Sequence, residues 1–80
     1  MPFFYATNVV LPIGKIVTGL LVDHQAQIHE NTRFMVLREG TLEEWAVDAV
    51  DNGASEYEIE KQRQQYEGWD FMKYYLVSVD

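Results

Sequence analysis

Four carboxylates lie close together in the middle of the chain: Glu43, Glu44, Asp48 and Asp51. Paired carboxylates perform acid–base chemistry when a pocket drives their proton affinities apart, and they bind divalent cations when several oxygens converge. Here they fall mainly on the polar face of a predicted helix, without the spacing of a calcium-binding loop. We therefore predict no catalytic residue, metal or cofactor, and we interpret Glu43, Glu44 and Asp48 as partner-binding residues.

The other reactive side chains do not form a recognisable site either. His24 and His29 are five residues apart, whereas a spacing of four would place both on one helix face as metal ligands. The sequence contains no glycine-rich phosphate loop and no nucleophile elbow. It also lacks cysteine, which excludes disulfides and thiolate metal ligands. These absences favour a protein that is not an enzyme.

Aromatic residues are frequent among the acidic ones, and tyrosine and tryptophan are enriched at binding hot spots. Trp45 falls on the apolar stripe of its helix and is predicted to be core. Tyr57 and Tyr66 lie on a more polar helix, so we predict that they contribute to a partner-binding surface. Packing of that helix against the body of the domain is the alternative explanation for both.

Two helices are predicted to position these residues. Thr41 and Glu44 form a capping box at the start of the first, which ends at Asn52-Gly53. Ser55 and Glu58 form the second box, and Gly68 ends the second helix. This helix is polar and is expected to lie on the surface.

The remaining segments are predicted to form strands at residues 3–10, 15–18 and 71–79, because they are rich in aromatic and β-branched residues. We expect the first to be central, and the last to be interior and beside the first. Residues 20–40 fit either a helix or a hairpin; we favour a helix, capped by Asn31 and ending at Gly40. The predicted fold is one small α+β domain spanning residues 1–80, with a mostly antiparallel sheet and two or three helices on one face.

Charge is distributed unevenly along the 80 residues. Residues 1–37 carry two acidic and two basic side chains, whereas residues 38–80 carry eleven acidic and four basic ones, so the whole net charge of −7 lies in the second part. Such a field repels nucleic acid and attracts basic surfaces. No apolar run of about 20 residues or signal peptide is present, so we expect a cytoplasmic protein without membrane contact.

The run Phe4-Tyr5-Ala6-Thr7-Asn8, followed by Leu11-Pro12-Ile13-Gly14-Lys15-Ile16-Val17 and the closing residues 75–80, resembles small bacterial and phage proteins of the ADP-ribosyltransferase-like fold. The resemblance covers about a quarter of the chain. It implies a nicotinamide dinucleotide ligand, with an arginine or histidine on the first strand and a late catalytic glutamate. The first strand here has neither arginine nor histidine, so the resemblance implies a trimmed, inactive relative.

Charge and composition together predict a small acidic protein-interaction module, of the type of a phage or bacterial regulator or inhibitor, that binds a basic protein surface. A trimmed ADP-ribosyltransferase-like nucleotide-binding domain is the alternative. A homo-oligomer is a third reading, because a chain of this size buries only about 60% of its unfolded surface.

Overall fold

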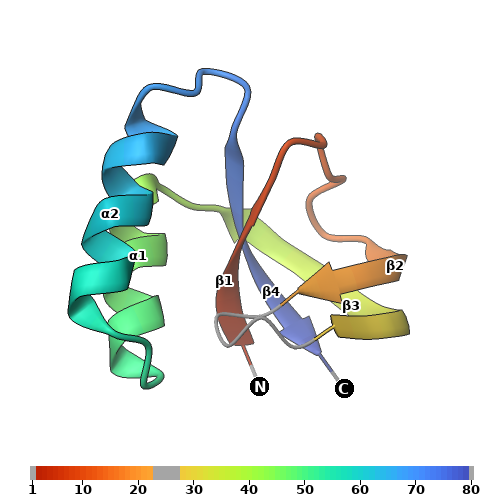
Figure 1. Ribbon diagram of the computed structural model, residues 1–80. Helices are drawn as coiled ribbons and strands as arrows, with labels where there is room; N and C mark the ends of the chain where they lie inside the picture. Colours follow the sequence, from red (N-terminus) through yellow and green to blue (C-terminus); the bar gives the residue numbers. More distant parts are fainter. Residues whose placement is uncertain (1, 23–27, 80) are drawn as a thin grey trace.

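The computed structural model describes residues 2–22 and 28–79. Its sheet has four antiparallel strands in the order β1-β4-β3-β2, and two helices lie side by side at the β1 end (Figure 1). The predicted α+β class is therefore confirmed. The elements in chain order are β1 (Pro2–Thr7), β2 (Ile16–Val22), β3 (Ile28–Glu39), α1 (Leu42–Asp51), α2 (Glu56–Glu67) and β4 (Lys73–Val79).

Both helices begin and end where their caps predict. Thr41 and Glu44 form both halves of the capping box of α1, and the Ser55 hydroxyl accepts the backbone N–H of Glu58 at the start of α2. Gly53 follows α1 with a φ of 98°, a left-handed conformation that glycine adopts without a steric penalty. Neither α1 nor α2, the helices of the described part of the chain, has the length and apolar character needed to cross a membrane.

Strand β4 lies between β1 and β3, so the predictions that it is interior and pairs with the first strand are confirmed. The prediction that the first strand is central was wrong, because β1 is at one end of the strand order. Its apolar pattern has another cause: Phe3 and Tyr5 pack against one hydrophobic cluster, while Phe4 and Ala6 pack against a second. An edge strand that is covered on both faces has the same sequence pattern as a central one.

Residues 20–40 do not form the favoured helix. They belong to the hairpin of β2 and β3, apart from residues 23–27, which include His24 and lie outside the described residues. Asn31 caps nothing; its φ of 54° occurs where residues 30 and 31 of β3 lie opposite residue 20 alone, a β-bulge. The run from Phe34 to Leu37 alternates as a strand does, with Phe34 and Val36 buried.

Two hydrophobic clusters lie on opposite faces of the sheet. We call them the sheet cluster (Phe34, Val36, Tyr75 and Val77) and the helix cluster (Trp45, Ala46, Ala49 and Ile59). The helices cover the second. The connection between β1 and β2 covers the first, since Leu11 packs on it and donates its backbone N–H to the Tyr75 hydroxyl oxygen at 3.1 Å. This connection exposes Val9 and Val10, which are outside β1 although the sequence predicted strand there.

Candidate functional site

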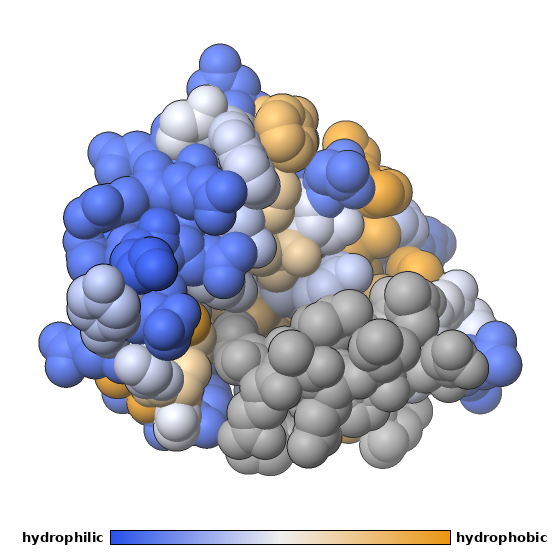
Figure 2. Space-filling model, in the orientation of Figure 1, coloured by the Kyte–Doolittle hydropathy of each residue, from blue (hydrophilic) through white to orange (hydrophobic). Residues whose placement is uncertain are grey.

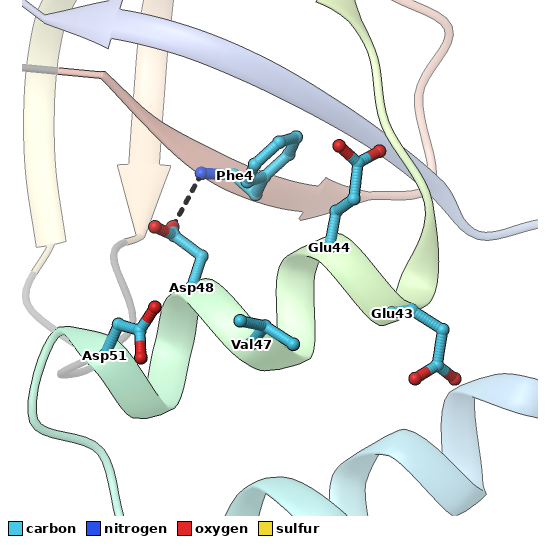
Figure 3. Close-up of a pocket in the computed structure, with 6 residues that line it drawn as sticks. All are labelled: Phe4, Glu43, Glu44, Val47, Asp48 and Asp51. Carbon is cyan, nitrogen blue, oxygen red and sulfur yellow. Dashed lines mark hydrogen bonds between the residues drawn. The ribbon is translucent and has the colours of Figure 1, made fainter.

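An acidic groove of about 370 Å³ lies between α1 and β1 (Figure 3). All but one of its lining residues come from α1, so the helical repeat brings them together; the exception is Phe4 of β1. The groove combines two apolar side chains with four carboxylates. It is lined by Phe4, Glu43, Glu44, Val47, Asp48 and Asp51.

Asp48 ties helix α1 to the edge strand. One of its carboxylate oxygens accepts the backbone N–H of Phe4 at 2.9 Å, and the other accepts the side-chain amide of Asn52 at 3.1 Å. The N–H of Phe4 faces away from β4, so the carboxylate satisfies a donor that the sheet leaves unpaired. This predicted partner-binding residue therefore has a structural task, and it holds Phe4 at the groove.

Glu44 is engaged by Arg38 of β3. Two guanidinium nitrogens donate to its carboxylate at 2.7 and 3.3 Å, and the backbone N–H of Thr41 donates to it at 3.1 Å. Hydrogen bonds from Arg38 hold the pKa of Glu44 below its usual value. The Arg38 guanidinium also lies over the Phe4 ring, 5.2 Å from its centroid. The Arg38 side chain thus contacts the apolar ring of Phe4 and the carboxylate of Glu44 at the same time.

Glu43 and Asp51 present the more open carboxylates of the groove. Glu43 is 71% exposed and pairs with Arg63 of α2 at 3.1 Å, a contact that links the two helices. Arg63 also pairs with Glu60 and Glu67, so its single charge is shared among three carboxylates. Within residues 2–22 and 28–79, Asp51 forms no ion pair.

The two predicted tyrosines lie outside this groove. Tyr57 is 69% exposed, and the Lys61 ammonium is 5.5 Å from its ring centroid. Tyr66 packs between Trp45 and Trp69, at centroid distances of 5.2 and 5.5 Å, and burial raises the pKa of its hydroxyl. The structure therefore brings Glu43, Glu44 and Asp48 together, and leaves the tyrosines elsewhere on α2.

The apolar part of the groove was not predicted from the sequence. Val47 could have indicated it, because an aliphatic residue on the polar face of a predicted helix is expected to stay exposed, as Val47 does in α1. Phe4 gives no such indication, since its contact with Asp48 joins residues 44 positions apart in the chain.

The acidic charge is reduced by internal pairing but not removed. Residues 41–67 contain eight acidic and two basic side chains, and adding Arg38 still leaves an excess of five negative charges. Figure 2 shows a broad hydrophilic surface over the helices, whereas hydrophobic side chains gather towards the opposite upper side. The helical part of the chain therefore carries an excess of negative charge, and we call the outer surface of α1 and α2 the acidic face.

No group of three or more histidine, aspartate or glutamate residues that could hold a metal ion occurs in the part of the chain that the structure describes. No family model, curated protein or solved structure matches the chain. The resemblance to ADP-ribosyltransferase-like proteins therefore stays a prediction. Of the residues that carry it, Tyr5 packs edge-on against Phe34, and the Thr7 hydroxyl accepts the backbone N–H of Val9.

Proposed function

We propose that this protein is an interaction module whose acidic face binds a basic protein surface. The observation that carries the proposal is the groove beside α1, where apolar and acidic side chains occur together. Lysine and arginine are amphipathic: their methylene stems pack on apolar surface while their charged ends stay near water or a carboxylate. A basic side chain of a partner fits such a groove better than a neutral or acidic one.

The contacts of Arg38 support this mode of binding. Its guanidinium lies over Phe4 and pairs with Glu44, at one end of the groove. Val47 and Asp51 offer the same combination farther along α1. A partner's basic side chain placed there would contact Val47 with its stem and Asp51 with its charge, while Asp48 keeps Phe4 in place.

Charge over the whole helical half would act at longer range. An excess of acidic residues on one side steers basic partners towards that side and keeps nucleic acid away. Because exposed charges are screened within about 8 Å at physiological ionic strength, the binding must weaken as salt is added. A small regulator or inhibitor of phage or bacterial type would work in this way, by covering a basic surface of its target.

Titration with a synthetic peptide of alternating arginine and leucine, followed by NMR chemical-shift changes and calorimetry, tests the proposal. Asp51→Asn removes one open charge from the groove and is expected to weaken binding about two- to fivefold. Asp70→Asn is the matched control, because it removes the same charge from the connection between α2 and β4.

We expect shifts at Val47 and Asp51, and an affinity that falls with added salt. Binding that ignores ionic strength, or that decreases equally in both variants, would contradict the proposal. Shift changes confined to the β1–β2 connection would contradict it as well.

A further inference from the structure

The two edges of the sheet differ in how they are protected. At the β1 edge, Pro2 has no N–H to offer, and the outward N–H of Phe4 is bonded to Asp48. Helix α1 also packs beside this strand (Figure 1). Proline, a charged side chain and a covering helix are devices by which proteins prevent edge strands from pairing with other chains.

On the β2 edge, the stretch Ile16–Thr18 carries no proline and no charged side chain, although Lys15 directly precedes it and the bulge opposite residue 20 follows it. The carbonyl of Lys15 accepts the backbone N–H of Val36 at 3.0 Å, so Lys15 faces β3. Main-chain groups alternate in direction along an antiparallel strand, so those of Ile16 and Thr18 point away from the sheet. Within residues 2–22 and 28–79, no hydrogen bond reaches these outward groups.

Apolar side chains accompany this open edge. Ile16 is 52% exposed, and its partner across the strands, Met35, is 39% exposed. Thr18, the second residue with outward-facing main-chain groups, is also exposed. An edge with free main-chain groups and flanking apolar surface is a template for pairing with another strand.

We propose that β2 pairs with β2 of a second copy of this chain, which extends the antiparallel sheet across a two-fold axis. Charge favours the β2 edge over the β1 edge for pairing between two copies. The net charge of residues 1–37 is zero, and the acidic helices lie at the opposite end of the sheet from β2 (Figure 1). Two copies joined at β2 therefore hold their acidic faces far apart, whereas pairing at the β1 edge would bring like charges together.

The association is expected to be weak. A few main-chain hydrogen bonds and the side chains around Ile16 bury less than the roughly 1,200 Å² of a standard interface. We therefore expect a dissociation constant of about 10 μM to 1 mM. Added salt would leave the dimer unchanged or tighten it, because it screens repulsion between the acidic faces. This response is opposite to that of the proposed partner binding, on which the inference does not rest.

Sedimentation equilibrium of the full chain, at concentrations up to about 1 mM, tests the inference. Thr18→Pro removes the outward N–H and leaves the bonds from Val17 to β3 intact, since an edge strand tolerates proline where its N–H faces solvent. Thr18→Ala is the matched control, because it keeps that N–H. We expect the wild type and Thr18→Ala to dimerise equally, and Thr18→Pro to bind at least about tenfold more weakly.

Circular dichroism shows whether Thr18→Pro is folded, and Thr18→Lys, which keeps the N–H but adds charge to the edge, provides a second variant. Phe71→Ser tests a different exposed apolar surface, the stacked rings of Trp69 and Phe71 in the connection before β4. A wild type that is monomeric at the highest concentration would overturn the inference. So would a dimer that Phe71→Ser dissociates and both the folded proline variant and Thr18→Lys leave intact.

Discussion

The sheet cluster and the helix cluster lie on opposite faces of the same sheet, and they differ in the residue types that form them. The sheet cluster consists of aromatic and β-branched residues, and Val36, Tyr75 and Val77 are almost fully buried. The helix cluster contains two alanines beside Trp45 and Ile59, and the carboxylates of the groove lie on the same helix α1. The sheet cluster is more completely buried, since three of its four residues are at most 1% exposed, whereas only Ala49 of the helix cluster is. We therefore expect the sheet cluster to contribute more to stability, whereas the proposed partner-binding groove lies on the helix side.

The largest effect is expected from truncation at the centre of the sheet cluster. Tyr75→Ala removes a ring that is 1% exposed, together with the acceptor of the Leu11 N–H, and should cost about 3–5 kcal/mol of unfolding free energy. Ile59→Ala in the helix cluster should cost less, about 2–3 kcal/mol, because the polar α2 can shift to fill the space. Urea unfolding followed by far-ultraviolet circular dichroism measures both. An equal or larger loss of unfolding free energy in Ile59→Ala would contradict the greater contribution of the sheet cluster to stability.

An intermediate effect is expected where α1 meets β1. Asp48→Ala leaves the outward N–H of Phe4 without its charged acceptor and should cost about 1.5–3 kcal/mol. Asp51→Ala, one helical turn away on the same groove, should change stability by less than about 0.5 kcal/mol. The comparison is made in the same urea titration. Similar values for the two variants would mean that the bond to Phe4 does not hold the helix to the strand.

A smaller effect is expected at Gly40. A Cβ added there would lie 2.8 Å from two atoms of the Phe4 ring, so Gly40→Ala must displace that ring. The expected cost is about 1–2 kcal/mol, with a weaker response of the groove to the arginine–leucine peptide. Gly68→Ala is the matched control, because its nearest contact is 3.7 Å away at ordinary φ. Unchanged melting temperature and peptide binding in Gly40→Ala would show that Phe4 is not fixed.

The smallest effect concerns pH. Arg38 lowers the pKa of Glu44 in the folded protein, so this pair stabilises the fold above the unfolded glutamate pKa of about 4.3. The contribution is lost as the pH falls through the lower, folded pKa. Glu44→Gln should therefore reduce the acid dependence of thermal stability below that pH. Glu39→Gln, on the neighbouring strand residue, serves as the control, and an identical acid dependence in both variants would exclude the Arg38–Glu44 pair as its source.

Local signals in the sequence predicted the helical half well. The caps at Thr41, Ser55 and Gly53 depend on contacts within a few residues, so each can be recognised in the sequence without knowledge of the rest of the fold. The same holds for β4, whose apolar residues on both faces required an interior position. The carboxylates of the groove were found for this reason too, since one helix supplies them all.

Contacts between distant parts of the chain could not be predicted from the sequence. The pairing of β2 with β3, and the bulge at Asn31, depend on partners across the sheet, and the same apolar run fits a buried helix. The edge position of β1 was missed because burial by a loop and by helices has the same pattern as burial by strands. The position of Phe4 at the groove depends on the tertiary fold, because its backbone N–H binds the distant Asp48 carboxylate.

The stack of aromatic rings has an optical consequence. Trp45 and Trp69, the two tryptophans of the sequence, both contact Tyr66, and Trp69 stacks on Phe71 at 5.5 Å. Indole emission therefore originates wholly on the side of the helices, and the face beneath the β1–β2 connection contributes only tyrosine signal. Tryptophan emission and circular dichroism recorded on one sample would distinguish loss of the helices from loss of the strands. The two tryptophans therefore show, without an added label, which face of the sheet is exposed first on unfolding.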